Sequence, residues 1–596
     1  MNKSIFIPII ALIVIGCGPT PKEEAQTFID DYTSEFIDLY YASAKAEWMA
    51  NTRIIPGDTT NSSAVQQANE ALAAFTGSEA NINSIKSLMK KQAELEPLQI
   101  RQLETMLYAA ANNPAIIPEV VSARIKAESA QTEQLFGFDF QIDGESVTTN
   151  EIDGILNSET DIDKRLTAWE ASKEVGKELK DGLANLQQLR NKTVQALGYD
   201  NYFAYQVSEY GMTTDEMIAT CDQLVKDIWP LYRELHTYAR YELAKKYNAE
   251  VPEMLPAHWL PNRWGQDWSE MVEVEGIDLN DVLEQKGPKW LVEQAERFYI
   301  SLGLSPLPNS FYELSSLYPL PEDVTYKKNN HASAWHMNLQ EDVRCLMSVE
   351  PNASWYETTH HELGHVYYYL EYTNPEVPPL LRGGANRAFH EAVGSMMGLA
   401  AMQQPFLEGI GLVPAGTETD QTQALLKEAL NYIVFIPFSA GVMTQFENEL
   451  YANDLSPEAY NKTWWELAAK YQGMVPPSER GEEFTDAASK THINNDAAQY
   501  YDYALSYAIL FQLHDHIATN ILNADPRATD YYGNKEVGKF LHELLSVGAT
   551  KDWRQLLQET TGEGISAKAM LKYFDPLMEY LKAENQGREC TLPESI

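Results

Sequence analysis

Apolar side chains recur along this chain mostly at the three-to-four-residue spacing of an α-helix. In residues 23–49, five large apolar or aromatic side chains follow this spacing. They are Phe28, Tyr32, Phe36, Leu39 and Tyr40. Residues 161–198 continue the pattern, and Gly198 is a suitable helix C-cap. We therefore predict long, partly exposed helices in both stretches.

Strand patterns are sparse in the sequence. The clearest lies at residues 341–349, EDVRCLMSV, and predicts an edge strand. Pro-rich joints at 255–261 and 304–323 mark no change of composition, and we find no internal repeat. We expect a mostly α fold with minor β structure. We also expect a single domain over residues 25–596, formed by two helical halves around a cleft.

The N-terminus has the features of an export signal. Residues 1–16 place Lys3 before an apolar run, the pattern of a secretory signal peptide. The run ends in VIGC, which resembles the bacterial lipobox, where the cysteine becomes lipidated. We expect a lipid on Cys17, a tether over residues 17–24, and anchoring to a bacterial membrane on its periplasmic side or at the cell surface. Gly18 favours the outer membrane.

The composition is strongly acidic. The 596 residues include 86 Asp and Glu against 45 Lys and Arg, a net charge of -41. This charge argues against nucleic acid as a partner, because a phosphate backbone needs a basic surface. The other cysteines, Cys221, Cys345 and Cys590, are odd in number and far apart, so no disulfide framework is implied. We expect membrane contact through the N-terminal lipid only.

A metal-binding pattern occurs in the stretch SWYETTHHELGHVYYYLEY, which begins at Ser354. Only one register gives H-E-x-x-H, with His361, Glu362 and His365. On a helix, positions i and i+4 lie one turn apart on one face, so both imidazoles can reach one ion. The stretch therefore predicts a zinc site, provided that it is helical and that a third ligand exists.

Local signals favour a helix in this stretch. Ser354 and Glu357 have the spacing of a capping box, and no proline follows until Pro375. Gly364, inside the motif, costs helix stability. Its presence therefore needs another reason, such as close packing against a neighbouring element.

The third ligand is predicted on a second helix, which reads NRAFHEAVG from its expected N-cap Asn386. Glu391, 26 residues after His365, can supply a carboxylate oxygen. Two His and one Glu leave the fourth tetrahedral position open for water, as in catalytic zinc sites. We interpret the flanking His360 and His390 as packing residues or as partners of the ligands.

This ligand set predicts hydrolysis. Zinc lowers the pKa of a bound water and polarises a carbonyl group. Glu362, next to a ligand, is placed to accept the water's proton and to pass it to a leaving amine. Peptide hydrolysis is the reaction class that follows, but the spacing alone does not identify a substrate.

Several sequence blocks resemble the angiotensin-converting-enzyme family of zinc peptidyl-dipeptidases, in its bacterial branch. The blocks are NRWGQDW, HASAW, HHELGHVYYYLEY, LLRGGANRAFHEAVG, ALNYIVFIPFSAGV, WWELAAKYQG, KTHI and YYDY. They lie in the family's order within residues 189–513. The resemblance implies a large helical two-lobed ellipsoid with a deep central channel, a helical lid and a gluzincin zinc site. It also implies release of dipeptides from peptide C-termini.

The same resemblance implies a set of substrate-binding residues. They are Gln266, His331, Ala334, Lys490 and Tyr500. Gln266, Lys490 and Tyr500 would bind the terminal carboxylate, for which a cation and neutral donors are suited. Anchoring the terminus fixes how many residues fit before the zinc. Ala334 would offer its backbone to an extended peptide.

Two further roles concern the reacting carbonyl group. By resemblance, His331 and His492 would hydrogen-bond the backbone carbonyl near the scissile bond, and Tyr503 would donate to the oxyanion of the tetrahedral intermediate. The spacing after His492 departs from the family pattern by one residue. Tyr501 therefore remains an alternative to Tyr500 or Tyr503 in the two tyrosine roles.

The sequence also departs from the family pattern at charged positions. Asp502 and Ala468 stand where chloride-activated members carry arginine, so we expect no chloride activation. Ser395 replaces an acid that would hydrogen-bond a zinc histidine, so we expect a weaker or different partner there.

Other functions remain open at this point. A single-residue carboxypeptidase is one, although the relative with that activity carries Arg in place of Gln266. An oligopeptide endopeptidase would not need Lys490 and Gln266 as an anchor. An inactive peptide-binding lipoprotein is another, and the intact His361, His365 and Glu391 argue against it. We expect a monomer that contains one Zn²⁺ and acts on oligopeptides with a free C-terminus.

Overall fold

The computed structural model describes residues 19–55, 58–274, 279–321, 323–329 and 331–596. The chain is 66% helical and 4% strand, which confirms the predicted mostly α fold. The predicted signal peptide and the predicted lipidation site, Cys17, lie outside the described residues.

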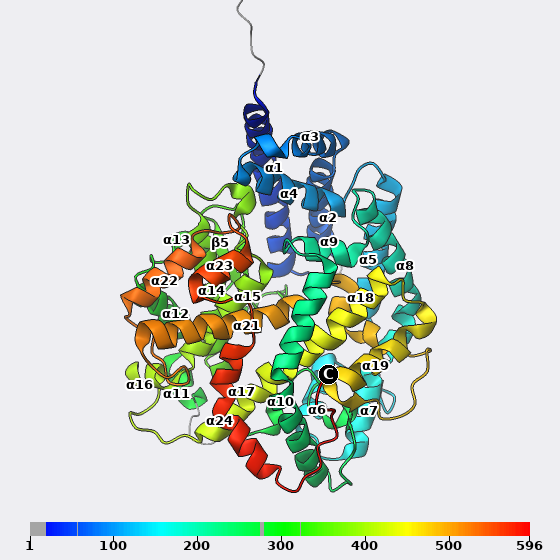
Figure 1. Cartoon of the computed structure of the whole chain (residues 1–596), viewed down its shortest axis with the longest axis vertical. Coiled ribbons are helices and arrows are strands. Elements are labelled where there is room, and N and C mark those ends of the chain that lie inside the picture. The colour runs from blue at the N-terminus through cyan, green and yellow to red at the C-terminus, as the bar shows by residue number, and fades with distance from the viewer. Residues whose placement is uncertain (1–18, 56–57, 275–278, 322, 330) are drawn as a thin grey trace, which may run out of the picture.

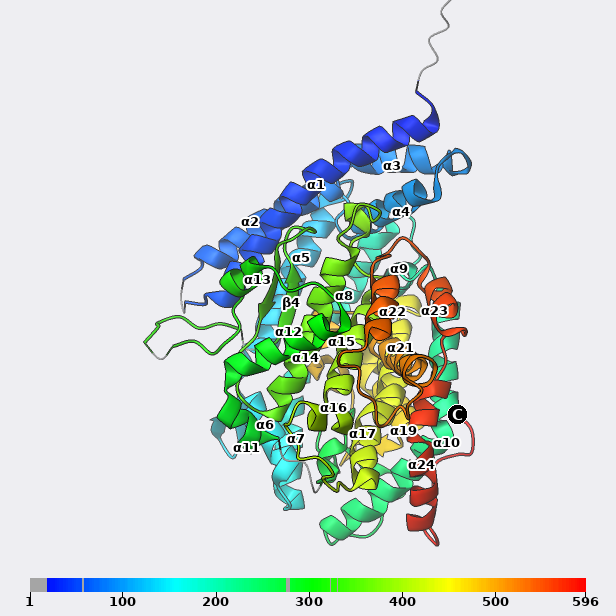
Figure 2. The ribbon, with the colours of Figure 1, turned by 90° about the vertical axis from the view of Figure 1, so that its left-hand side faces the viewer.

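Four N-terminal helices form a layer across one end of the molecule (Figures 1 and 2). They are α1 (Pro21–Thr52), α2 (Thr60–Thr76), α3 (Glu79–Met89) and α4 (Pro97–Asn112). The helix predicted over 23–49 is α1, and Thr20 and Glu23 form a capping box at its start. Tyr32, on the predicted apolar stripe, belongs to a small core that α1 shares with α3 and α4. This layer therefore has buried contacts of its own, separate from the main core.

The body of the molecule is also built of helices. They are α5 (Pro118–Phe136), α6 (Thr149–Ser158), α7 (Ile162–Lys173), α8 (Val175–Gln195), α9 (Tyr202–Ser208), α10 (Thr214–Lys246), α11 (Asn280–Lys286), α12 (Pro288–Leu302), α13 (Asn309–Leu314), α14 (Ala353–Tyr372), α15 (Arg387–Ala401), α16 (Gln404–Gly409), α17 (Gln421–Ile436), α18 (Thr444–Ala452), α19 (Tyr460–Gln472), α20 (Thr491–Asn495), α21 (Tyr501–His516), α22 (Lys535–Leu545), α23 (Trp553–Thr561) and α24 (Lys568–Glu584).

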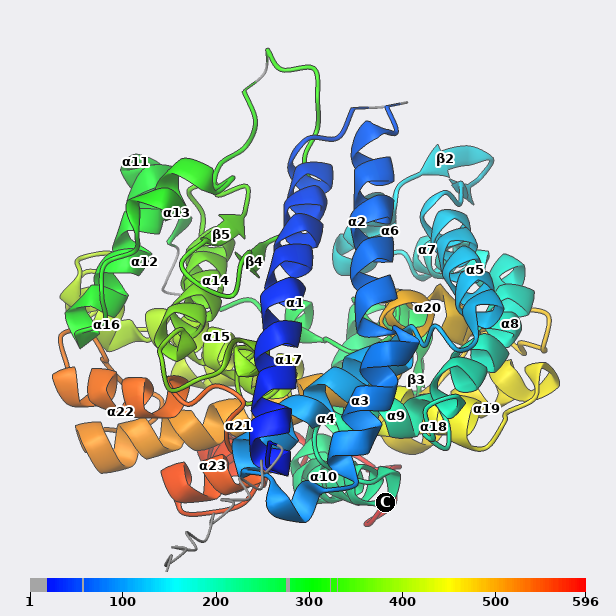
Figure 3. The ribbon, with the colours of Figure 1, turned by 90° about the horizontal axis from the view of Figure 1, so that it is seen from above.

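Seen from above, the body has two sides, and α1 runs between them (Figure 3). Helices α11 to α16, with α22 and α23, form one side, and α5 to α9, with α18 and α19, form the other. One continuous core of buried side chains joins the two sides. In the described part of the chain, one helical run, 421–452, has the length and composition of a membrane span, but 83% of its most apolar window is buried inside the protein. This run is therefore a core helix.

The strands form three two-stranded sheets in the described part of the chain. They are β1 (Phe140–Ile142) with β2 (Glu145–Val147), β3 (Leu255–Pro256) with β6 (Met474–Val475), and β4 (Ser333–His336) with β5 (Val343–Leu346). The strand predicted over 341–349 is β5, which is shorter than predicted. It pairs antiparallel with β4, and Ala334 lies opposite Cys345. This hairpin comes just before α14 in the chain.

The helical structure predicted over 161–198 is present as two helices, α7 and α8, which are divided at Glu174. The backbone angles of Glu174 are still helical (φ −59°, ψ −35°), and α8 ends at Gln195. A Cβ atom at Gly176 would lie 2.5 Å from the carbonyl oxygen of Thr485, so the first turn of α8 packs directly on another backbone segment. That contact leaves no room for a side chain at position 176, which helical periodicity does not reveal. Gly198, with φ +103°, ends the turn after α8.

Helices α14 and α15 approach closely at one pair of glycines. A Cβ atom at Gly364 would lie 3.0 Å from the Cα of Gly394 and 3.2 Å from the hydroxyl of Tyr299. The close packing predicted for Gly364 is therefore present. Since α14 and α15 carry all three predicted metal ligands, this contact fixes how those ligands meet.

Substituting Gly364 by Ala tests this contact. We expect Gly364→Ala to lower the midpoint of thermal unfolding, because overpacking at a tight contact costs about 1–3 kcal/mol and outweighs a helix-propensity gain of about 1 kcal/mol. Gly154→Ala is the matched control, since Gly154 lies in α6 and an added Cβ there would meet no neighbouring atom within 4 Å. It should raise the midpoint slightly. Equal shifts for both variants would contradict the proposed role of the glycine contact.

Candidate metal centre

The H-E-x-x-H pattern lies on α14. Its N-cap is Asn352, whose side chain accepts a hydrogen bond from the Trp355 N–H at 2.9 Å. The predicted capping box at Ser354 is therefore wrong, because Asn352 satisfies the free N–H and Ser354 is already within the first turn. His361 and His365 lie on one face of the helix, and their Nε2 atoms are 3.0 Å apart.

The second helix brings in the third predicted ligand. Asn386 caps α15 by accepting a hydrogen bond from the Phe389 N–H at 2.8 Å, as the sequence predicted. Glu391 Oε2 lies 3.9 Å from His361 Nε2. One ligand atom from each of His361, His365 and Glu391 lies within 4.8 Å of the other two. Among the described residues, this is the group of His, Cys, Asp or Glu side chains that is placed to hold a metal ion.

Each of the two histidines has a partner on its other ring nitrogen. His365 Nδ1 lies 2.9 Å from His390 Nδ1, and His361 Nδ1 lies 3.5 Å from Ser395 Oγ. Burial lowers the pKa of His361 and His365 to about 4, and at His361 the neighbouring His365 adds to the effect. Both imidazoles are therefore neutral near pH 7, and their Nε2 atoms face each other. Two imidazole nitrogens and a carboxylate oxygen form a donor set that fits Zn²⁺.

The two histidines that flank the ligands lie in different surroundings. His390 contacts His365, as the distance between their Nδ1 atoms shows. His360 is fully buried, its Nδ1 lies 2.8 Å from the Tyr356 carbonyl oxygen, and its ring packs edge-on against Phe298. His360 is thus a packing residue and His390 a partner of a ligand, which are the two interpretations that the sequence allowed.

Glu362 lies beside the ligands on the wall of a cavity. Its side chain is buried, and its Oε2 has no hydrogen-bond partner among the described residues. Burial, together with the nearby charge of Glu391, raises the pKa of Glu362 to about 8. A cation held by the three ligands would oppose this shift and favour the carboxylate. Glu362 therefore has a free oxygen and a proton affinity suited to proton transfer.

The cavity has a volume of about 860 Å³ and lies next to the metal ligands. Its wall includes His361, Glu362, His365 and Glu391. The side chain of Glu47, on α1, lines it as well, so the N-terminal layer forms part of this wall. A space of this size accommodates an extended peptide segment.

Three residues predicted to bind a terminal carboxylate meet at one place. Lys490 Nζ donates to Gln266 Oε1 at 2.7 Å, and the Tyr500 hydroxyl lies 3.4 Å from the same oxygen. Lys490 is buried, and its ammonium lies 4.3 Å from the centre of the Trp264 ring. Burial lowers the pKa of Lys490 to about 7, and the nearby Arg263 adds to this effect. The group is a buried donor set with little compensating negative charge.

The structure distinguishes among the three candidate tyrosines. The Tyr503 hydroxyl lies 3.4 Å from His492 Nε2, and its ring centre is 4.9 Å from that of Tyr500. Tyr503 also lines the cavity with the metal ligands. Tyr501 instead packs edge-on against Phe203 in the core. Tyr500 and Tyr503 therefore lie together at the site, and Tyr501 does not.

The remaining predicted substrate-binding residues lie on or before β4. His331 is exposed and lines the cavity, as does Ala334. The carbonyl of Ala334 accepts a hydrogen bond from the Tyr369 hydroxyl at 3.2 Å. A carbonyl oxygen has two lone pairs, so a peptide N–H can share it.

Arg387 is a residue of the site that the sequence patterns did not predict. It is the first residue of α15, it lines the cavity, and it pairs with Asp496 and Asp502. Arg387 thus brings a cation close to Asp502 from another helix. The sequence offers no signal for this pairing, because the partners are more than 100 positions away along the chain.

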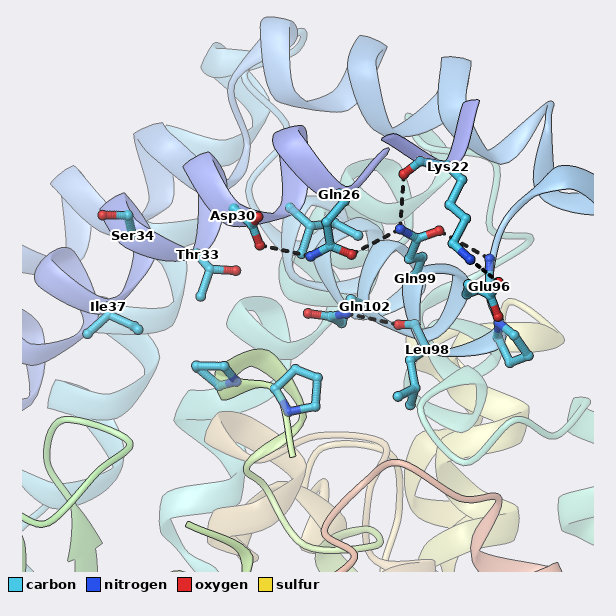
Figure 4. A pocket seen from close by; sticks show the side chains of 14 residues that line it. Lys22, Gln26, Asp30, Thr33, Ser34, Ile37, Glu96, Leu98, Gln99 and Gln102 are labelled. Atoms are coloured by element: carbon cyan, nitrogen blue, oxygen red, sulfur yellow. Dashed lines mark hydrogen bonds and ion pairs between the residues drawn. The ribbon is translucent and has the colours of Figure 1, made fainter. Parts of the chain in front are cut away.

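A second cavity, of about 780 Å³, lies between α1, α4 and the turn at Pro378 and Pro379. Its polar side chains bond mainly to one another: Gln26 donates to Asp30, and Gln99 donates to Gln26 (Figure 4). None of the predicted site residues lines it. The chemistry therefore belongs to the first cavity.

A helical protein with an H-E-x-x-H helix and a glutamate from a second helix at a large cavity has the site of a metallopeptidase. The chain matches the family described as angiotensin-converting enzyme over residues 19–592. It therefore belongs to the angiotensin-converting enzyme family of metallopeptidases, as the sequence blocks predicted.

Relatives of this chain include animal proteins of that family. It is 32% identical to the angiotensin-converting enzyme-like protein Ace3 of Mus musculus over 74% of this chain and 61% of Ace3. It is 29% identical to the angiotensin-converting enzyme of Oryctolagus cuniculus over 95% of this chain and 43% of that protein. It is 28% identical to the angiotensin-converting enzyme of Theromyzon tessulatum over 94% of this chain and 92% of that protein. The chain thus covers less than two thirds of the first two relatives.

Zinc affinity tests the assignment of ligands and partners. We expect His390→Ala to weaken Zn²⁺ binding about 10–100-fold, because it removes the partner that orients His365. Glu391→Ala removes a ligand and should weaken binding further. His360→Asn is the matched control and should leave the zinc affinity unchanged. The measurement is competition with a chelating dye on folded protein, and an equal loss in His360→Asn would refute the assignment.

Proposed function

We propose that this protein is a zinc peptidyl-dipeptidase, which releases dipeptides from the free C-termini of oligopeptides. The observation that carries the proposal is the buried donor set of Lys490, Gln266 and Tyr500 close to the metal centre. The Tyr500 ring lies 4.9 Å from that of Tyr503, which lines the same cavity as Glu391. A carboxylate bound to this set would place a nearby peptide bond at the metal ligands.

The charge of the donor set supports a carboxylate as its ligand. A buried ammonium that lacks an acidic partner favours an anion that brings the missing charge. Gln266 and Tyr500 add neutral donors, since the amide NH₂ of Gln266 remains available when its oxygen accepts from Lys490. Because an anchored terminus fixes which peptide bond reaches the reacting groups, this set would also determine the length of the product.

The reaction follows from the side chains around the cavity. A zinc ion held by His361, His365 and Glu391 would supply Lewis acidity, which polarises the scissile carbonyl and acidifies a water molecule. Glu362 accepts the proton of the attacking water on its free oxygen and delivers it to the nitrogen of the leaving dipeptide. Tyr503, with its hydroxyl next to His492, donates a hydrogen bond to the oxygen on which negative charge develops.

Location, assembly and ion dependence complete the proposal. We propose that the protein is exported, carries a lipid on Cys17 and acts as a monomer at a bacterial membrane. We also propose activity without chloride. Arg387 supports this point, because its donors already face Asp496 and Asp502. These features remain predictions from the sequence.

A blocked tripeptide and its C-terminally amidated copy test the proposed function. The lipid-free protein should release a free dipeptide from the acid form only, and a chelator should abolish this release. Equal cleavage of the amidated peptide would indicate an endopeptidase, and release of one amino acid would indicate a single-residue carboxypeptidase. Glu362→Gln is the control for contaminating peptidases. It should retain zinc and lose about 10²–10⁴-fold in kcat, the range for a general base.

The pKa of Lys490 predicts a pH dependence. A lysine with a pKa lowered to about 7 is charged below this pH and neutral above it. Since only the charged form attracts a carboxylate, kcat/KM should fall as pH rises through about 7, towards tenfold per pH unit. In Lys490→Arg, whose guanidinium stays charged, this fall should disappear. A pH profile that is the same in both proteins would assign the fall to another group.

A further inference from the structure

Arg387 makes several contacts at one end of the cavity. Its Nη1 donates to Asp496 Oδ1 at 3.0 Å and its Nη2 donates to Asp496 Oδ2 at 2.7 Å, which is a bidentate pair. Nη1 also donates to Gln499 Oε1 at 3.2 Å, and Nε lies 3.5 Å from Asp502 Oδ2. Most of its donors therefore face groups of the chain itself.

A second pair of hydrogen bonds, through Tyr210, also joins α15 to α21. The Tyr210 hydroxyl accepts a hydrogen bond from the Ala388 N–H at 3.1 Å and donates to Asp502 Oδ1 at 2.6 Å. Asp502 is 1% exposed; its Oδ1 accepts from Tyr210, and its Oδ2, which has no hydrogen-bond partner among the described residues, lies 3.5 Å from Arg387 Nε. The first turn of α15 is thus joined to the first turn of α21 by Arg387 and by Tyr210.

The joined segments carry the groups that the proposed reaction needs. Glu391 lies one helical turn after Arg387 on α15. His492 lies four positions before Asp496, and Tyr503 directly follows Asp502. Arg387 therefore connects α15, which carries Glu391, with the segments that carry His492 and Tyr503. In the proposed reaction these two side chains face the oxygen on which negative charge develops.

Of the two aspartates near Arg387, Asp496 is the one whose charged form Arg387 stabilises more. Burial raises the pKa of Asp496, but the hydrogen bonds and the charge of Arg387 outweigh it and lower this pKa overall. At Asp502 burial outweighs the charge of Arg387 and raises the pKa to about 8. The side chain of Arg387 is 33% exposed, so solvent in the cavity reaches it. A bidentate arginine–carboxylate pair has a fixed geometry, which suits it to setting a distance between two segments.

We propose that Arg387 is a positioning residue, which holds Tyr503 and His492 at the correct distance from Glu391 and the metal centre. The inference rests on the proposed peptidase function and adds a residue to it. Arg387 acts through Asp496 and Asp502, so it affects the transition state more than substrate binding. Of the proposed carboxylate binders, Gln266 lies on another segment. Lys490 is the N-cap of α20, which also carries His492, but its ammonium donates to Gln266.

Arg387→Ala is the central variant. We expect kcat to fall about 10–100-fold with KM within about threefold, because misplacement by about 1 Å can cost 10²-fold. Methylguanidinium at millimolar concentration should restore kcat in a saturable way, since the deleted group is reachable from the cavity. Urea, which has a similar shape and no charge, should not. Arg387→Lys should be intermediate, because an ammonium cannot form the bidentate pair.

Two controls separate positioning from folding. Arg527→Ala removes a similar bidentate arginine, paired with Asp525 outside the cavity, and should leave kcat unchanged. The Co²⁺-substituted protein provides a readout without turnover. Its visible spectrum should change in Arg387→Ala, because Glu391 shifts, and should return with methylguanidinium.

The possible results test the role of Arg387 separately from the proposed peptidase function. An unchanged kcat and spectrum in Arg387→Ala would overturn the positioning role, as would a loss that methylguanidinium does not restore. A rise in KM alone would make Arg387 a substrate-binding residue instead. Failure of the wild-type protein to release dipeptides would refute the proposed function, whereas the spectra would still test the positioning role of Arg387.

Discussion

The contact between α14 and α15 is the constraint on which the site depends. Gly364 and Gly394 meet with no side chain between them, and the His361 ring lies over the same Gly394, 3.0 Å from where its Cβ would be. A glycine within a helix costs about 1 kcal/mol relative to alanine. Here two such residues allow the helices to approach until His361 and His365 face Glu391. The metal centre is therefore a consequence of helix packing as much as of ligand spacing.

Burial then determines the charge state of the site. It lowers the pKa values of His361, His365 and Lys490 and raises that of Glu362. All of these shifts favour the neutral form, because the enclosed cavity solvates charge poorly. A metal cation would favour the charged form of Glu362, and a substrate carboxylate would favour the charged form of Lys490. The arrangement of side chains is thus suited to two binding partners of opposite charge.

Sequence reasoning succeeded where the information is local or carried by resemblance. The spacing of His361 and His365 placed both on one helix face, and Asn386 marked the start of α15. It failed in two places. Asn352 rather than Ser354 caps α14, and the helical stretch over 161–198 is divided at Glu174, close to where Gly176 packs against a distant backbone segment. Neither competition between caps nor such a contact is visible in the periodicity.

Arg387 shows the same limit at the functional site. By resemblance, Asp502 stands where the chloride-activated members of the family carry arginine, so position 502 alone suggests the loss of a positive charge. The structure places a guanidinium 3.5 Å from that aspartate, from the start of another helix. The field that acts on Tyr503 depends on where charges lie in space, and Arg387 brings a cation to α21 from a position more than 100 residues away along the chain. The positions of the predicted metal ligands follow from one helix and one helix crossing, whereas the positions of the charges around them depend on contacts between residues far apart along the chain.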